Sequence, residues 1–121
     1  MPLDDATAHR LASVRTIDLI TTGRLSGRPA RVEIWWFRFD DRFVITGTPG
    51  PRDWLANIRT DPTIVIHADG ADYPAKAVEV DDPEVRRRFF DQTRGEVRWY
   101  RSQAQLDRLV AEAPMVEIRF T

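Results

Sequence analysis

The sequence predicts a mainly β domain of the α+β class, in which six antiparallel strands close toward a small barrel with flanking helices. Three observations predict this class. Segments rich in β-branched residues cluster along the chain, and two-residue turns such as Asp40-Asp41 and Asp69-Gly70 join several of them. The regular alternation of strands and helices that a parallel sheet requires is absent. Because the 121 residues contain no repeat or linker, we interpret residues 1–121 as one domain.

The first half of the chain is expected to hold one helix followed by three strands. Asp4 or Asp5 can cap a short amphipathic helix, because an N-cap carboxylate accepts from a free backbone N–H. The segment TIDLITT, residues 16–22, is dominated by β-branched residues and predicts the first strand. A tight turn at Asp40-Asp41 then joins the next two predicted strands, residues 30–39 and 42–48.

The second half is expected to add a helix, a hairpin, two further helices and a last strand. Pro51 is placed to open the first of these helices. The acids and the proline in DDPEVRRRFFDQT, residues 81–93, are typical of a helix N-terminus. We expect the arginines of that helix to lie on a solvated flank. The remaining predicted elements are strands at 63–68, 72–80 and 114–120 and a helix at 101–112.

The composition excludes several classes of function. Eighteen basic and 19 acidic residues give a net charge of −1, so we predict no nucleic-acid binding, which usually needs a basic excess. The absence of cysteine excludes thiol nucleophiles and Cys-ligated metals, and the two histidines have no neighbouring ligands at metal spacing. No apolar run is long enough for a membrane span, and the first residues lack the pattern of a signal peptide. We therefore expect a cytoplasmic protein with no metal site.

The strand RVEIWWFRF, residues 31–39, carries a tryptophan on each of its two faces. Alternation places Trp35 and Phe37 on one face and Ile34 and Trp36 on the other. One face can line the barrel, and the second must then meet helices, another subunit or a flat ligand. Packing in the core or in a dimer and contact with a ring-shaped ligand therefore both remain open.

Two glycine-containing turns could together hold a phosphorylated aromatic cofactor. In the first, TTGRLSGR at residues 21–28, glycines permit close backbone approach, and exposed N–H groups form a concavity for anions. The second, TGTPGPRDW at residues 46–54, precedes a predicted helix N-terminus, which favours phosphate. Either turn alone could be an ordinary surface hairpin. The candidate cofactor-binding residues are Thr22, Arg24, Ser26, Gly27, Arg31, Trp35, Trp36, Thr46, Thr48 and Arg52.

These residues resemble a motif of the deazaflavin-dependent nitroreductase family. Its members are flavin and deazaflavin oxidoreductases with a pyridoxamine-phosphate-oxidase-like split β-barrel. The similarity is strongest over residues 16–80. Three family positions are occupied differently here: Leu25 stands where the family usually has a lysine, Ala30 where it has an arginine, and Pro49 where a basic residue is common. The matching positions are Thr21 to Gly27, Pro29, Trp54, Asn57, Ile58, Pro62 and Ile64 or Val65.

The resemblance implies a split barrel that forms a homodimer and binds an 8-hydroxy-5-deazaflavin coenzyme of the F420 type, with FMN as the alternative cofactor. It also implies hydride transfer to a small electron-poor acceptor such as a quinone or a nitro compound. Trp99, Tyr73 and Tyr100 are candidates for the substrate side of the ring. The alternatives are a non-catalytic flavin or tetrapyrrole carrier of the same fold and a structural dimer with a vestigial pocket.

Overall fold

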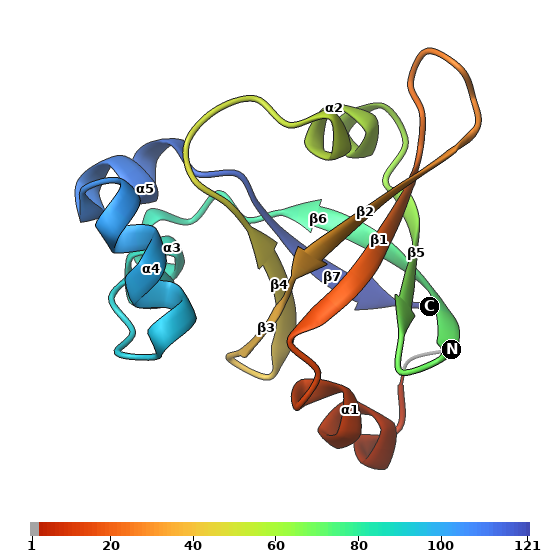
Figure 1. Ribbon diagram of the computed structural model, residues 1–121, viewed down its shortest axis with the longest axis horizontal. Coiled ribbons are helices and arrows are strands. Elements are labelled where there is room, and N and C mark those ends of the chain that lie inside the picture. The colour runs from red at the N-terminus through yellow and green to blue at the C-terminus, as the bar shows by residue number, and fades with distance from the viewer. Residues whose placement is uncertain (1–2) are drawn as a thin grey trace.

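Seven antiparallel strands form one strongly curled sheet in the computed structural model, which describes residues 3–121 (Figure 1). The order across the sheet is β2-β1-β5-β6-β7-β4-β3, so β2 and β3 are its two edges. This confirms the mainly β class with flanking helices. The strands are β1 (Thr16–Thr22), β2 (Pro29–Trp35), β3 (Phe37–Phe39), β4 (Arg42–Thr46), β5 (Thr63–Ala68), β6 (Ala71–Glu79) and β7 (Met115–Phe120).

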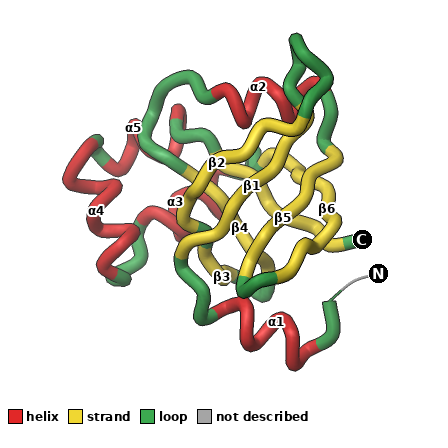
Figure 2. The backbone as a smooth tube through the Cα atoms, turned by 45° about the vertical axis from the view of Figure 1, so that its right-hand side comes forward, coloured by secondary structure: helices red, strands yellow, loops and turns green. Residues whose placement is uncertain are grey.

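The helices close the ends of the curled sheet and cover one side of it. Helix α1 lies at one end and α2 at the other, while α3, α4 and α5 group together beside β3 and β4 (Figures 1 and 2). Helices α1 and α2 therefore flank the two ends of the curled sheet. The helices are α1 (Asp5–Ala12), α2 (Asp53–Thr60), α3 (Pro83–Phe90), α4 (Gly95–Gln103) and α5 (Leu106–Glu112).

Two apolar clusters hold these layers together. The first fills the curled sheet and contains Leu19, Trp36 and Phe43, with Leu11 of α1 packed into it. The second lies between the sheet and the α3–α5 group and is built around Phe89 of α3, which is fully buried. Both clusters bury aromatic rings, which contribute large apolar areas to stability. The site described below lies where the second cluster reaches the surface.

The predicted strand 30–39 is interrupted at Trp36, which is why the sheet has seven strands rather than six. The Trp36 backbone N–H donates to the Arg15 carbonyl at 3.0 Å, and the indole Nε1–H donates to the Val14 carbonyl at 2.7 Å. These bonds join the strand break to the segment before β1. The predicted alternation nevertheless holds, since Ile34 packs with Trp36 inside the sheet and Trp35 packs on the helix side.

Most predicted turns and caps are confirmed, and the C-terminal helix prediction is wrong. Asp4 caps α1 by accepting from the Thr7 N–H at 2.7 Å, and Asp40 and Asp41 adopt the positive φ angles of 51° and 56° that a tight hairpin turn requires. The single helix expected at 101–112 is instead divided between α4 and α5. The reason is the extended backbone at Ala104, which ends α4.

Two absences hold for the part of the chain that the structure describes. No helix within residues 3–121 is long and apolar enough to cross a membrane. Over the same range, no group of three or more His, Cys, Asp or Glu side chains is arranged to hold a metal ion.

Replacing Trp36 with alanine should destabilise the fold far more than the same change at Trp99. Trp36 is 3% exposed and stacks on Phe43 with ring centroids 4.2 Å apart, whereas Trp99 is 48% exposed. We expect Trp36→Ala to lower the free energy of unfolding by about 3–5 kcal/mol and Trp99→Ala by less than about 1 kcal/mol. Urea denaturation followed by circular dichroism measures both. Equal losses would contradict the placement of Trp36 in the core.

Candidate functional site

The first turn is a closed loop between β1 and β2. The Gly23 N–H donates to the Arg28 carbonyl at 2.8 Å, and the Gly27 N–H donates to the Gly23 carbonyl at 2.8 Å. Gly27 has φ +72°, a conformation that glycine adopts without the cost other residues incur. The Ser26 hydroxyl oxygen accepts from the Arg28 N–H at 3.1 Å. The loop therefore has a defined shape before any ligand binds.

Asn57 joins this loop to helix α2. Its Nδ2 donates to the Thr21 hydroxyl at 3.0 Å, and its Oδ1 accepts from the Arg24 backbone N–H at 3.1 Å and from Arg24 Nη1 at 2.9 Å. Asn57 and Thr21 are 4% and 3% exposed, so the bond between them forms away from water, whereas the two bonds from Arg24 are partly buried. The Arg24 guanidinium also reaches the Asp53 carboxylate at 3.2 Å. Sequence reasoning did not include Asn57 among the site residues.

The second turn folds around the side chain of Arg52, which directly precedes α2. Arg52 Nη2 donates to the Thr48 carbonyl at 2.8 Å and to the Thr48 hydroxyl at 2.9 Å. Arg52 Nη1 donates to the Gly50 carbonyl at 3.1 Å. Because Arg24 bonds to Asp53, the residue after Arg52, both turns meet at the N-terminal half of α2. Five of the predicted residues, Arg24, Ser26, Gly27, Thr48 and Arg52, thus lie on two loops that share one helix.

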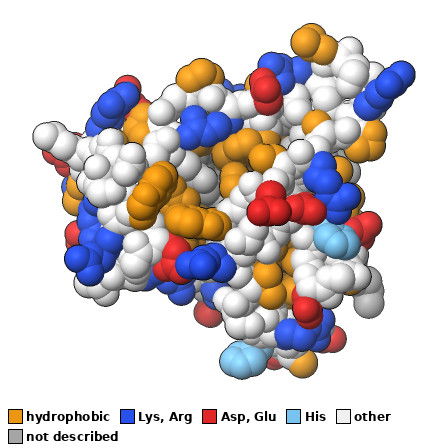
Figure 3. Space-filling view, viewed as in Figure 1, with side chains coloured by type: hydrophobic (Ala, Val, Ile, Leu, Met, Phe, Trp, Pro, Cys, Tyr) orange, Lys and Arg blue, Asp and Glu red, His pale blue; other side chains and the backbone are white. Residues whose placement is uncertain are grey.

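An aromatic surface lies between β2 and α4. Trp35 and Trp99 meet edge to face with ring centroids 5.9 Å apart, and Tyr100 lies 6.1 Å from Trp35. The Arg15 guanidinium stands 5.8 Å from the Trp35 ring and pairs with Glu96 of α4 at 3.1 Å. Hydrophobic side chains gather on this face of the molecule beside a hollow in the surface (Figure 3). Exposed indole rings on this surface can stack against a flat ligand.

Tyr100 belongs to the aromatic surface and has a strongly shifted pKa. Burial raises the pKa of Tyr100 to about 12, and the positive charge of Arg52 acts in the opposite direction. Tyr100 is only 5% exposed, and its hydroxyl has no hydrogen-bond partner among residues 3–121. No buried side-chain polar atom in that range is left without a partner, so the hydroxyl reaches the surface. It is free to donate to a ligand.

Several predicted site residues lie elsewhere. Trp36 is part of the core, so its ring cannot form the wall of an open site. The hydroxyl of Thr46 is buried and donates to the Pro114 carbonyl. Arg31 pairs with Asp18 across β1 and β2 at 2.9 Å. Tyr73 accepts from Arg10 and packs against Phe120, away from Trp99. The remaining predicted residue of β1, Thr22, pairs with Pro29 at the base of the first turn.

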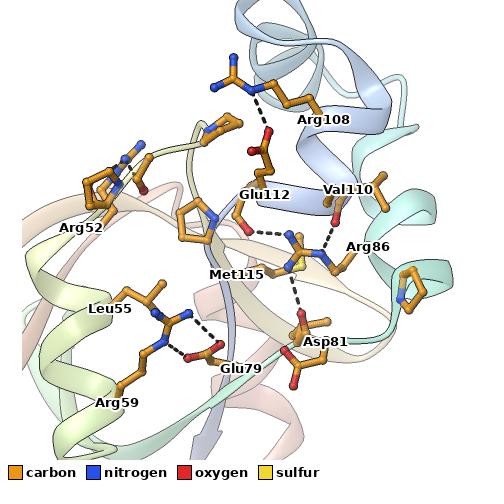
Figure 4. A pocket seen from close by; sticks show the side chains of 18 of the residues that line it. Arg52, Leu55, Arg59, Glu79, Asp81, Arg86, Arg108, Val110, Glu112 and Met115 are labelled. Carbon is orange, nitrogen blue, oxygen red and sulfur yellow. Dashed lines mark hydrogen bonds and ion pairs between the residues drawn. The ribbon is translucent and has the colours of Figure 1, made fainter.

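A cavity of about 710 Å³ opens beside the second turn (Figure 4). Its walls come from residues 49–52, α2, the end of β6, α3, α5 and the start of β7, and none comes from the first turn. Arg52 of the second turn is one of the lining residues.

Comparison with protein families identifies the group to which the chain belongs. The model of the F420H(2)-dependent quinone reductase family matches residues 3–112. The chain belongs to this family. No curated protein is a significant match to the sequence.

Solved structures give this family member its fold. A candidate pyridoxamine 5'-phosphate oxidase from Listeria innocua aligns with a TM-score of 0.71 and 9% identity, over 96% of this chain and 91% of its own. An F420 reductase aligns with a TM-score of 0.66 and 15% identity, over 98% and 96%. An FAD-binding protein from Mesorhizobium loti aligns with a TM-score of 0.67 and 14% identity, over 100% and 92%. The predicted split barrel is therefore confirmed.

The cofactor of the family is an F420-type deazaflavin, and the chemistry of the described residues fits such a group. A flat ring system with an anionic tail requires a stacking surface next to cationic and amide donors. Exposed Trp99 lies beside Trp35 and Tyr100, and the positive charge of Arg52 in the second turn acts on the Tyr100 phenol. The position expected to carry a lysine in the first turn is Leu25, which is 93% exposed. The donors are thus fewer than the family pattern provides, and all of them are arginines, hydroxyls or backbone amides.

Removing the Asn57 side chain should loosen the first turn from α2. We expect Asn57→Ala to lower the free energy of unfolding by about 2–4 kcal/mol, because it leaves the buried Thr21 hydroxyl and Arg24 without their partner. Asn57→Asp keeps an acceptor for Arg24 and should cost less. Urea denaturation measures both variants. A loss below about 1 kcal/mol in Asn57→Ala would contradict the tethering role.

The ionisation of Tyr100 should depend on Arg52. We expect its phenolate to form in the folded protein at about pH 12, above the ordinary pKa of 10.0. The folded state then keeps a proton that the unfolded state loses, so this stability is present below pH 10 and lost between 10 and 12. Arg52→Gln should raise the pKa further. The near-ultraviolet difference spectrum against Tyr100→Phe isolates the transition, and a midpoint near 10 in folded protein would refute the burial.

Proposed function

We propose that this protein is an F420-dependent oxidoreductase that delivers hydride from the reduced coenzyme to a small electron-poor acceptor, a quinone or a nitro compound. Membership of the quinone reductase family supports the redox class. The observation that carries the proposal is the Tyr100 hydroxyl, which is unbonded within the described chain, belongs to a side chain packed edge to face with Trp35 and exposed Trp99, and is subject to the positive charge of Arg52. That arrangement combines a stacking surface with donors.

The two turns would hold the tail of the coenzyme. Arg52 and the hydroxyl of Thr48 lie at the start of α2, where free backbone N–H groups favour an anion. The first turn adds its backbone N–H groups. Arg24 is already bonded to Asn57 and Asp53, so we assign it mainly to fixing the loop. These contacts would orient the bound coenzyme and keep its position fixed.

The aromatic surface would hold the ring and the acceptor. Trp35 and Trp99 can stack against flat groups and exclude water from them. The coenzyme, when bound, supplies the hydride. Tyr100 is protonated at neutral pH, as a phenol ordinarily is, and its raised pKa of about 12 extends the protonated form further into the alkaline range. Its O–H can therefore donate to an acceptor oxygen and stabilise the negative charge that develops there.

We also propose that the active form is a homodimer. Strand β2 is an open edge of the sheet and carries Val32, which is 36% exposed, while Leu25 and Trp99 are also exposed. Exposed apolar groups beside an open sheet edge favour association with another chain. A second copy could cover the aromatic surface and enclose a ligand there. The cytoplasmic location stays a prediction from the sequence.

Binding and turnover should respond separately to changes in the two parts of the site. We expect Arg52→Gln to weaken binding of oxidised F420 at least about tenfold, since it removes a charge-assisted contact, as measured by tryptophan quenching. Tyr100→Phe should leave that affinity nearly unchanged but lower kcat for menadione reduction by about 100-fold.

Two controls make the outcome specific. Arg87→Gln removes an exposed arginine that pairs with Asp107 of α5, and it should change neither quantity. Titration with FMN measures the affinity for the alternative cofactor, for comparison with F420. A protein that binds F420 but does not reoxidise it with menadione would support a non-catalytic carrier. Wild-type binding in Arg52→Gln would remove the second turn from the site.

A further inference from the structure

The cavity in Figure 4 is a concave site separate from the aromatic surface. Its volume of about 710 Å³ falls within the range of small-molecule pockets. None of Trp35, Trp99 and Tyr100 lines it. Its walls instead bring together α2, α5 and the segment that leads from β6 into α3. A ligand in this cavity would therefore touch a different set of side chains from a ring on the aromatic surface.

The walls of the cavity combine apolar and charged side chains. The apolar ones include Leu55 of α2, Val80 after β6, Val110 of α5 and Met115. Prolines of the second turn and of the α3 N-terminus add rigid apolar surface. These side chains favour contact with the apolar part of a ligand, because its transfer from water contributes roughly 25 cal/mol per Å².

Two of the arginines lining the cavity are neutralised by carboxylates. Arg59 of α2 bonds to Glu79 through both oxygens, and Arg108 of α5 pairs with Glu112 at 2.9 Å. Figure 4 shows both pairs at the cavity. They contribute little net charge to its interior.

Arg86 is buried and has no carboxylate partner among the described residues. The expectation that the arginines of residues 85–90 lie on a solvated flank is therefore wrong for Arg86. Its side chain is 8% exposed and donates to four backbone carbonyls, those of Val80, Leu109, Val110 and Ala113. It has no ion-pair partner within residues 3–121. Burial lowers the pKa of Arg86, and the charges of Asp81 and Glu79 oppose that effect. The guanidinium is hydrogen-bonded but its charge is not paired.

Arg52 has the same property on another wall. Its donors bond to oxygens of Thr48, Gly50 and Pro51, all of them neutral, and it has no carboxylate partner in the described chain. Asp81 is the lining carboxylate without an ion-pair partner within residues 3–121. Four arginines and three acids line the cavity, so its wall carries one net positive charge.

We propose that this cavity is a binding site for an organic monoanion with an apolar body, such as an aromatic carboxylate or sulfonate. The anionic group would face Arg86 and Arg52, and the apolar body would lie on Leu55, Val110 and Met115. One net positive charge favours a monoanion, and the Asp81 carboxylate at the cavity disfavours a dianion.

The test uses 8-anilinonaphthalene-1-sulfonate, an aromatic monoanion whose fluorescence rises in an apolar site. We expect saturable binding to the cofactor-free protein that Ala111→Phe weakens at least about tenfold by filling the cavity from α5. The matched control is Ala6→Phe, on the exposed face of α1, which should bind as wild type does. Circular dichroism establishes that both variants are folded. Equal binding by the wild type and Ala111→Phe would overturn the proposal.

Two further measurements complete the test. One compares the role of the ligand's charge with that of its apolar surface, and the other distinguishes binding in the cavity from binding on the aromatic surface. N-phenyl-1-naphthylamine has the same frame without the sulfonate, and we expect it to bind the wild type at least about tenfold more weakly. Trp99→Ala alters the aromatic surface and should leave sulfonate binding unchanged. Equal affinity for the neutral probe, or loss of sulfonate binding in Trp99→Ala, would refute the site as assigned. Neither result depends on whether the protein binds F420.

Discussion

The bonds of Asn57 determine whether the two turns of the candidate site form one surface. A single buried amide donates to Thr21 at the end of β1 and accepts from the backbone and side chain of Arg24. Without it, the first turn would be an ordinary hairpin tip beyond the edge of the sheet. With it, the turn is fixed against the same helix that Arg52 precedes. The position of the loop is thus set by three hydrogen bonds, of which the one to Thr21 is buried and the two from Arg24 are partly buried.

The rest of the site is arranged around this tether by packing. The break at Trp36 places its ring inside the sheet while Trp35 stays on the side of α4. Arg15 then connects the start of β1 with Trp35 and Glu96. As a result, residues at the two ends of β1 hold the site, because Arg15 before the strand contacts the aromatic surface and Thr21 near its end bonds to Asn57. Because these residues are already held in place, the site needs little rearrangement to bind a rigid ring, which reduces the entropy lost on binding.

Local sequence signals predicted the parts of this structure that depend on short-range interactions. The turns at Asp40-Asp41 and Asp69-Gly70, the caps at Asp4 and Asp82 and the strands between them follow from the chemistry of neighbouring residues. The resemblance also identified the family correctly. The errors arose where contacts between segments far apart in the sequence determine the local structure. The strand break at Trp36 depends on carbonyls of Val14 and Arg15, and the burial of Arg86 depends on carbonyls from α5.

The site residues also divide into those that local sequence signals predict and those that depend on distant partners. Arg24, Thr48 and Arg52 could be named because their turns are local, whereas Asn57 acts through a partner 36 residues away and was missed. A crystal structure with oxidised F420 tests the central claim most directly. The account predicts the ring against Trp35 and Trp99, with the phosphate within hydrogen-bond distance of Arg52. A ring lying in the cavity beside Arg86, or a tail that touches neither turn, would contradict it.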